Sequence, residues 1–265
     1  MTILLLASLL STNGLGYVDR LVETHDPRTS LCRFVDYERA CGTQDFVLNT
    51  NFWLRGIDFS CVSPWNSANG RLRAGTAISK RHIVFAKHFP LAKDTRILFV
   101  GEDGGVCPCY VAATREVPGT DIMVGSLNAE LTPNIVPAKV LPEDYAGYIG
   151  DGGGFPVVTF NQHENAFLTY LAPINPSRNQ LLIKGREPPS LRQRQFRERI
   201  VVGDSGNPAF LLLDGQAVLL YTLYGGSCGS GHGLHAVRRE VQAAMDALCP
   251  GYRLESFDFA KPLSR

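Results

Sequence analysis

From Gly75 onward the chain alternates short hydrophobic runs with clusters of Gly, Pro, Asn and Asp. The runs are rich in Val, Ile, Leu, Phe and Thr, which favour β-strands, whereas the intervening residues favour turns. In the first half these runs cover residues 76–79, 83–86, 97–100, 110–114, 122–124 and 135–140. Many short strands at such spacing predict a β-barrel or a β-sandwich.

A glycine-rich stretch at 147–154 interrupts this pattern and reads as a link between domains or a long turn. A second series of hydrophobic runs follows it. These cover residues 155–160, 166–171, 181–183, 200–202, 209–213 and 217–223. Two sets of strands of similar number therefore predict two β units of comparable size.

Helical periodicity occurs only near the end of the chain. Between residues 236 and 248 the apolar positions fall three or four residues apart, as they do along one face of a helix. They are Val237, Val241, Ala244, Met245 and Leu248. Because the strands come first and one helix comes last, the order excludes a βαβ fold.

The N-terminus has the pattern of an export signal. The apolar run from Thr2 to Leu10 is too short to cross a bilayer, and Gly14 and Gly16 supply the small residues that precede a cleavage site. The run lacks a basic residue before it, so a buried N-terminal element is the alternative. We predict a signal peptide at 1–16, cleavage before Tyr17, and a secreted or periplasmic protein.

The balance of charged residues disfavours some classes of binding partner. The sequence holds 26 Lys and Arg against 25 Asp and Glu, a balance that provides no long-range attraction for nucleic acid or an anionic membrane. We therefore expect no nucleic-acid partner and no membrane contact after removal of the signal peptide. The oligomeric state is not specified by the sequence.

The chain contains seven cysteines, a number that fits an exported protein with a few disulfides and at least one remaining thiol. The N-terminal extension, residues 17–50, would be held by such a disulfide or by packing. Cys107 and Cys109 do not have the spacing of a zinc site, and no second pair of ligands accompanies them. The sequence therefore predicts neither a metal nor another cofactor.

The clearest chemical signal is a serine in a glycine-flanked turn, Gly203-Asp204-Ser205-Gly206, between two strand-like runs. A serine becomes a nucleophile when a base accepts its proton and N–H groups bind the oxyanion that develops on the attacked carbonyl. Glycines allow the backbone to approach that oxygen closely. Taken alone, the motif is equally consistent with a surface β-turn.

With Pro208, this motif is similar to that around the nucleophile of the chymotrypsin-like serine peptidases. The segment 75–88, which ends in Ala86-Lys87-His88, resembles the strand and turn that lead to the catalytic histidine of that family. Asp121, followed by apolar strand residues, resembles its aspartate. The three residues also occur in the order of that family.

The resemblance implies a secreted serine endopeptidase with a polypeptide substrate and an acyl-enzyme intermediate. It implies an all-β fold of two antiparallel six-stranded barrels with a C-terminal helix; we place the first barrel at 51–150, and the second, with the helix, at 151–265. His88, Asp121 and Ser205 would form the catalytic triad. The N–H groups of Gly203 and Ser205 would form the oxyanion hole. The positions expected to contact substrate are Arg199, Thr222, Leu223 and Tyr224.

Several alternatives stay open at this point. His82 is a competing base, although it lies inside the strand pattern. His163, His232 and His235 follow Asp121 in the sequence and would break the order His-Asp-Ser, so structural or surface roles are expected for them. For His232, the alternative is a role in substrate specificity. An α/β-hydrolase needs a second glycine where Asn207 stands. The alternative from another class is a protease-like binding or scaffold protein with a blocked cleft.

The sequence departs from the family in two places. Phe89 follows His88 where animal members carry a cysteine, which points to a bacterial-type relative. No basic residue followed by Ile-Val-Gly-Gly precedes the first barrel, so no new N-terminus is available to pair with Asp204. We expect Asp204 to be satisfied within the intact chain, the alternative being that residues 17–50 are a propeptide.

The expected substrate preference depends on one residue. Arg199 stands six positions before Ser205, where the family sets the floor of its primary pocket. An arginine there predicts a preference for an acidic or polar side chain. The alternative is that Arg199 has no part in specificity and points to solvent together with the other arginines of the segment 186–199.

Overall fold

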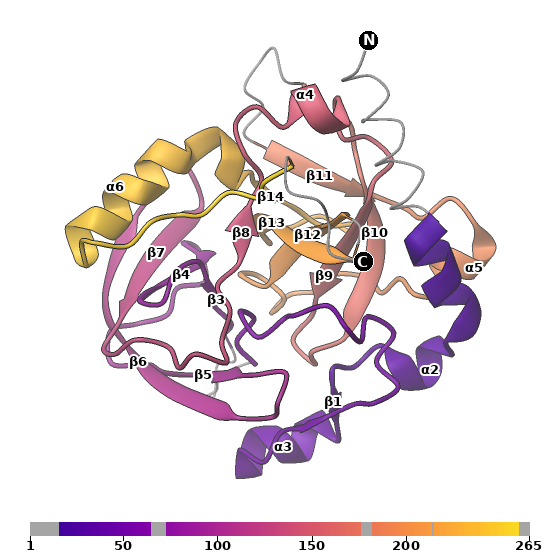
Figure 1. The fold of residues 1–265 in the computed structure, drawn as a ribbon, viewed down its shortest axis with the longest axis horizontal. Coiled ribbons are helices and arrows are strands. Elements are labelled where there is room, and N and C mark those ends of the chain that lie inside the picture. Colours follow the sequence, from indigo (N-terminus) through magenta and orange to yellow (C-terminus); the bar gives the residue numbers. More distant parts are fainter. Residues whose placement is uncertain (1–15, 65–72, 176–181, 214, 260–265) are drawn as a thin grey trace.

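The computed structural model describes residues 16–64, 73–175, 182–213 and 215–259 (Figure 1). Most of the regular structure is β, arranged in two curled sheets with a helix at the C-terminal end. This agrees with the all-β class predicted from the hydrophobic runs. Residues 1–15, which hold nearly all of the expected signal peptide, lie outside the described residues.

The first sheet contains five antiparallel strands in the order β3-β4-β7-β6-β5. They are β3 (Thr76–Ala77), β4 (His82–Ala86), β5 (Arg96–Val100), β6 (Val106–Glu116) and β7 (Ile122–Leu127). The side chains of β4 are all buried, which explains why this strand reads as an unbroken apolar run after its first residue.

The second sheet contains seven strands in the order β14-β11-β10-β9-β12-β13-β8. They are β8 (Lys139–Val140), β9 (Pro156–Phe160), β10 (Ala166–Leu171), β11 (Leu182–Arg186), β12 (Pro208–Leu213), β13 (Gln216–Thr222) and β14 (Ser230–His232). The strand counts in the described residues are thus five and seven, instead of six in each. One reason is that β8, which follows the first sheet in the chain, pairs in parallel with β13 of the second.

One sequence prediction fails locally between these strands. Residues 200–202 form a turn instead of a strand, because the N–H of Val201 donates to the carboxylate of Asp204, 2.8 Å away, instead of to a neighbouring strand. The glycine-rich link before β9 contains one helical turn, α4 (Ala146–Ile149).

The C-terminal helix packs on the first sheet, although it follows the second in the chain (Figure 1). It is α6 (Arg238–Leu248), preceded by the 3₁₀ turn η2 (Leu234–Val237). Val241 and Met245 are buried, and the Met245 carbonyl accepts a hydrogen bond from His82 Nε2 of β4 at 3.1 Å. The predicted periodicity is therefore confirmed, but the helix covers the N-terminal sheet.

The N-terminal extension is an ordered part of the fold. It contains a helical segment at 16–24, then α2 (Pro27–Ser30), β1 (Phe34–Val35), α3 (Tyr37–Thr43) and β2 (Val47–Leu48). Val18 and Val22 have at most 1% of their surface exposed. The carbonyl of Leu31 accepts from the N–H of Ala166 in β10 at 2.9 Å. Just after the extension, Trp53 Nε1 donates to the carbonyl of Ala166 at 2.8 Å, and its ring packs on Phe196. The extension is therefore held by packing against the second sheet.

The described cysteines do not form the several disulfides that we expected. Five cysteines of the described residues carry free thiols: Cys61, Cys107, Cys109, Cys228 and Cys249. Even Cys107 and Cys109, two positions apart on β6, hold their sulfurs 4.0 Å apart, about twice the length of a disulfide bond. Of the seven cysteines in the sequence, these five leave at most one intrachain pair.

Two buried ionisable side chains, those of Arg33 and Glu164, lie where the extension meets both sheets. Arg33, 2% exposed, donates through Nη2 to the carbonyl of Val100 and to Glu102 Oε1. Glu164 is fully buried in the turn between β9 and β10, and its carbonyl accepts from the N–H of Arg33 at 3.1 Å. Burial raises the pKa of Glu164 to about 8, partly opposed by the charge of Arg33.

This shift predicts how stability depends on pH. Between about pH 4.5 and about pH 8 the folded chain retains a proton on Glu164 that the unfolded chain has released, so the unfolding free energy contributed by this group falls as pH rises. Glu164→Gln removes the titration. We expect the difference in unfolding free energy, variant minus parent chain, to become more positive by a few kcal/mol from about pH 5 to about pH 8. Urea unfolding across that range measures it, and a pH-independent difference would contradict the assignment.

Within the part of the chain that is described, no helix has the length and hydrophobicity that a bilayer crossing requires.

Candidate active site

The register of two neighbouring strands brings His88 beside Asp121. Ala86, the last residue of β4, pairs with Ile122, the first residue of β7. The chain leaves β4 in a turn in which the N–H of Lys87 donates to the carbonyl of Asp121 at 2.7 Å. His88 follows directly, so an imidazole and a carboxylate meet at this end of the first sheet.

Ser205 comes from the second sheet, in the turn that precedes β12. Gly203 in this turn has φ +107° and Gly206 has φ +88°, both in the region that favours glycine. A Cβ on Gly203 would lie 2.6 Å from Gln162 Oε1, and one on Gly206 would lie 3.3 Å from the backbone nitrogen of Ala86. The glycines thus let the serine turn approach the end of β4.

The three side chains form a continuous hydrogen-bonded chain. The backbone N–H of His88 donates to Asp121 Oδ1 at 2.9 Å, and His88 Nδ1 lies 2.6 Å from Asp121 Oδ2. His88 Nε2 lies 2.8 Å from Ser205 Oγ. Because a carboxylate only accepts, Nδ1 carries the proton and Nε2 is left to accept from the serine hydroxyl. The His88 side chain is 39% exposed, so the group is open to solvent.

The serine turn also leaves two N–H groups available for an oxyanion. Asp204 N–H donates to the carbonyl of Val201, and Gly206 N–H donates to that of Leu223. In the described part of the structure, the N–H groups of Gly203 and Ser205 donate to no protein acceptor. These are the two donors that the sequence predicted, and such donors stabilise a developing oxyanion when they point at it.

Asp204 is fully buried but has hydrogen-bond donors within the chain. Its Oδ1 accepts from the N–H of Gln162 at 3.1 Å, and its Oδ2 accepts from the N–H of Val201 at 2.8 Å. Burial raises the pKa of this carboxyl, and the two hydrogen bonds counteract the shift. The expectation that Asp204 is satisfied in the intact chain is confirmed.

Because the turn is already formed, activity should need no cut beyond removal of a signal peptide. We expect the active species to keep the chain from about residue 17 onward, including the helical residues 17–24 and the strands β1 and β2. Intact mass measurement of the species that reacts with an active-site probe checks this expectation. Reactivity that appears only after loss of residues 17–50 would show instead that this segment is a propeptide.

His82 is not the base, although it also contacts a serine. Its Nδ1 lies 2.8 Å from Ser79 Oγ, and its Nε2 donates to the carbonyl of Met245. The ring is fully buried, and burial lowers its pKa. Since Ser79 is also buried and caps the N–H of Arg81, this pair stabilises the start of β4.

The other histidines have different surroundings. His163 Nδ1 lies 3.0 Å from Glu38 Oε1 at the surface. His235 is buried against Tyr145, and burial lowers its pKa to about 4. His232, by contrast, lies at the triad: its Nδ1 accepts from the backbone N–H of Asp121 at 2.6 Å.

The positions expected to contact substrate are not equivalent. Leu223 is fully buried, and both its N–H and its carbonyl are bonded within the serine turn, to Asn207 and Gly206. Thr222, 4% exposed, closes the pairing of β13 with β12. The backbone of Leu223 is therefore not free to pair with an extended substrate, whereas a substrate contact of Thr222 stays a prediction. Tyr224, 51% exposed, is the one that faces the site, with its ring edge-on to His88 at 5.5 Å between centroids.

Arg199 is exposed on the segment that leads to the serine turn. Its neighbour Arg197 is more enclosed: it forms an ion pair with Glu187 at 3.0 Å and donates to Cys228 Sγ. The polar-substrate preference ascribed to Arg199 stays a prediction.

Sequence reasoning missed the contacts that His232 and Tyr224 make around Asp121 and His88. His232 and Asp121 lie 111 residues apart in the sequence and belong to different sheets. No local motif links them, so only the packing of the two sheets could reveal the contact.

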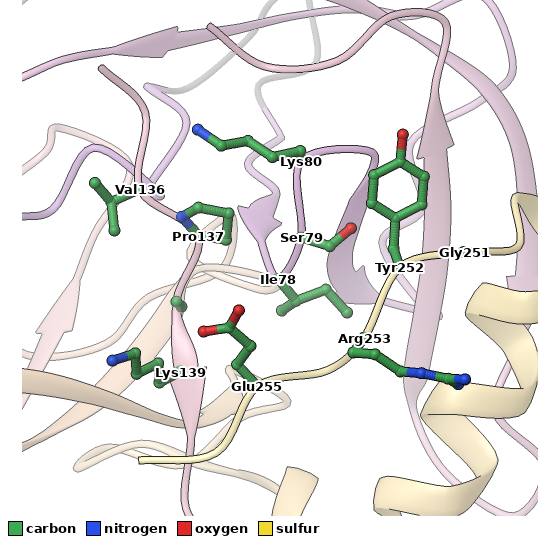
Figure 2. Close-up of a pocket in the computed structure, with 11 residues that line it drawn as sticks. Ile78, Ser79, Lys80, Val136, Pro137, Lys139, Gly251, Tyr252, Arg253 and Glu255 are labelled. Atoms are coloured by element: carbon green, nitrogen blue, oxygen red, sulfur yellow. The ribbon is translucent and has the colours of Figure 1, made fainter. Parts of the chain in front are cut away.

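A hollow of about 530 Å³ lies away from the triad, between the turn at Ser79 and Lys80, the segment 136–139 and the C-terminal segment 251–255 (Figure 2). Its lining includes none of the three triad residues. Lys80, on its rim, is bonded to the carbonyls of Thr132 and Ile135. Across the described ranges, no cluster of three or more His, Cys, Asp or Glu side chains could hold a metal ion.

Comparison with known protein families finds no family model that matches this chain, and comparison with curated proteins finds no similar sequence.

Proposed function

We propose that the protein is a serine endopeptidase of the chymotrypsin-like kind that hydrolyses polypeptides through an acyl-enzyme. The observation that carries this proposal is the hydrogen-bonded chain from Asp121 through His88 to Ser205. Its atoms have the order and distances that nucleophilic catalysis by serine requires. The two available N–H groups beside Ser205 supply the oxyanion site that such a reaction also needs.

In the proposed reaction, Ser205 Oγ attacks the carbonyl carbon of the peptide bond while His88 Nε2 takes its proton. The N–H groups of Gly203 and Ser205 bind the oxyanion of the tetrahedral intermediate. As this intermediate collapses, His88 gives the proton to the leaving amine and an ester with Ser205 remains. Water, deprotonated by His88, then cleaves the ester and restores the serine. Asp121 holds the imidazole in the required tautomer.

The remaining parts of the proposal follow from the resemblance and from the N-terminal pattern. The two curled sheets would correspond to the two barrels of that family, with the triad at their junction. The apolar run at the N-terminus supports export to a secreted or periplasmic location. Tyr224 and Arg199 are the residues that we propose for substrate contact.

A fluorophosphonate probe tests the proposal, because it reacts with a serine only when a base activates the hydroxyl. We expect the folded parent chain to be labelled at Ser205, and we expect His88→Ala to abolish labelling. Ser79→Ala is the matched control, since Ser79 also contacts a histidine but in a buried place. A folded parent chain without labelling would favour the alternative, a protease-like binding or scaffold protein. Labelling that survives Ser205→Ala would refute the assignment of the nucleophile.

A further inference from the structure

The residue His232 lies directly behind the catalytic aspartate. It ends β14 in the second sheet, where it pairs with Leu182 of β11. Its Nδ1 accepts a hydrogen bond from the backbone N–H of Asp121 at 2.6 Å. Asp121 belongs to the first sheet, so this bond connects the two sheets at the triad. The side chain and the backbone of Asp121 are thus held at the same time, by His88 on one side and by His232 on the other.

The hydrogen bond from Asp121 determines the protonation state and the tautomer of the His232 ring. A nitrogen that accepts from an amide carries no proton, so His232 is neutral and its proton is on Nε2. Partial burial lowers the pKa of His232, in keeping with this state, while the carboxylate of Asp121 acts in the opposite direction. If Nδ1 of His232 carried the proton instead, its N–H would point at the backbone N–H of Asp121, and two donors would face each other.

Tyr224 completes the arrangement. Its ring stacks on the ring of His232, with centroids 5.8 Å apart and an angle of 22° between planes. The same ring lies edge-on to His88 at 5.5 Å and 85°. The tyrosine ring therefore contacts both imidazoles. Of these two imidazoles, His88 belongs to the triad, and His232 bonds to the backbone of Asp121.

We propose that His232 is a positioning residue, which holds the backbone of Asp121 so that the Asp121 carboxylate keeps His88 aligned with Ser205. The inference rests on the proposed function, because it assigns a part in the same reaction. His232 does not touch the reacting atoms. It acts through the N–H of Asp121, and a small displacement of that residue would lengthen the 2.6 Å contact between Asp121 Oδ2 and His88 Nδ1.

Two substitutions separate the hydrogen bond from the ring. His232→Phe keeps a ring to stack on Tyr224 but removes the acceptor. His232→Asn removes the ring but places an amide oxygen near the position of Nδ1. We expect His232→Phe to lower kcat by roughly 10- to 100-fold with little change in KM. We expect His232→Asn to restore most of that loss. Thermal unfolding should show that both variants are folded.

The outcomes discriminate between roles. If His232→Phe leaves kcat unchanged, or if both variants lose kcat equally, the accepting nitrogen has no positioning role. If KM rises while kcat stays constant, His232 contacts substrate and the proposal is overturned.

Nuclear magnetic resonance of the parent chain and of His232→Phe tests the inference without turnover. We expect Nδ1 of His232 to be unprotonated, and we expect the His88 Nδ1–H resonance to shift or broaden in His232→Phe. A proton on His232 Nδ1, or an unchanged His88 resonance in the variant, would overturn the inference even where the parent chain is active. An inactive parent chain that still shows both expected signals would refute the proposed function and leave the geometric part of the inference standing.

Discussion

Replacing Ser205 with alanine should lower kcat for peptide hydrolysis by roughly 10⁶-fold, because loss of the nucleophile removes the acyl-enzyme route entirely. The side chain is half-buried in a glycine-flanked turn, and its hydroxyl bonds only to His88 among the described residues. Its removal therefore leaves the surrounding packing in place. We expect the melting temperature to change little and the turnover to fall to the background level.

Ser79→Ala provides the comparison for this result. Ser79 lies at a similar distance from a histidine, 2.8 Å from His82 Nδ1, but both groups are buried at the start of β4. This substitution should lower stability slightly and leave kcat unchanged. Equal loss of activity in the two variants, with both folded, would show that the serine turn is not the reactive centre.

The second large effect is expected for Asp121→Asn, which should lower kcat by about 10⁴-fold. The carboxylate accepts from both the backbone N–H and Nδ1–H of His88. A carboxamide can direct its NH₂ group at Nδ1, which favours the tautomer with the proton on Nε2. That tautomer cannot accept the proton of Ser205, so the geometry survives while the base is lost.

Steady-state rates of the folded Asp121→Asn variant measure this effect. Asp45→Asn, at an exposed position, is the control. Asp45 lies on the N-terminal segment, before β2, and should tolerate the change. Retention of full activity by Asp121→Asn would mean that His88 is oriented by other groups.

The strands and the order of the triad could be predicted because local sequence determines them. The run from Ile83 to Ala86 is apolar, in keeping with the burial of β4 throughout, and the turn after it carries His88. Gly203 and Gly206 reveal the serine turn because both have positive φ angles, in the region that favours glycine. The place of His82 inside the strand pattern favours His88 as the base, and the burial of His82 agrees with this.

The remaining features depend on contacts between distant segments. The N-terminal extension looks polar and irregular, yet the carbonyl of Leu31 accepts from the N–H of Ala166 in the second sheet. The helix α6 is periodic, but its sequence does not say which sheet it covers. The backbone bonds of Leu223 have a similar origin, because only the packing of the serine turn shows that its N–H and carbonyl are bonded to Asn207 and Gly206. The place of His232 behind Asp121 likewise appears only when the sheets meet.

If the proposed triad hydrolyses peptide bonds, one comparison shows it directly. An unfolded protein substrate is incubated with the parent chain and, separately, with Ser205→Ala purified in the same way, and new termini are identified by mass spectrometry. We expect internal cleavage by the parent chain alone, at sites whose preceding residues also reveal whether acidic or polar side chains are preferred. Absence of cleavage by a folded parent chain, or the same cleavage by both proteins, would contradict the proposed peptidase activity.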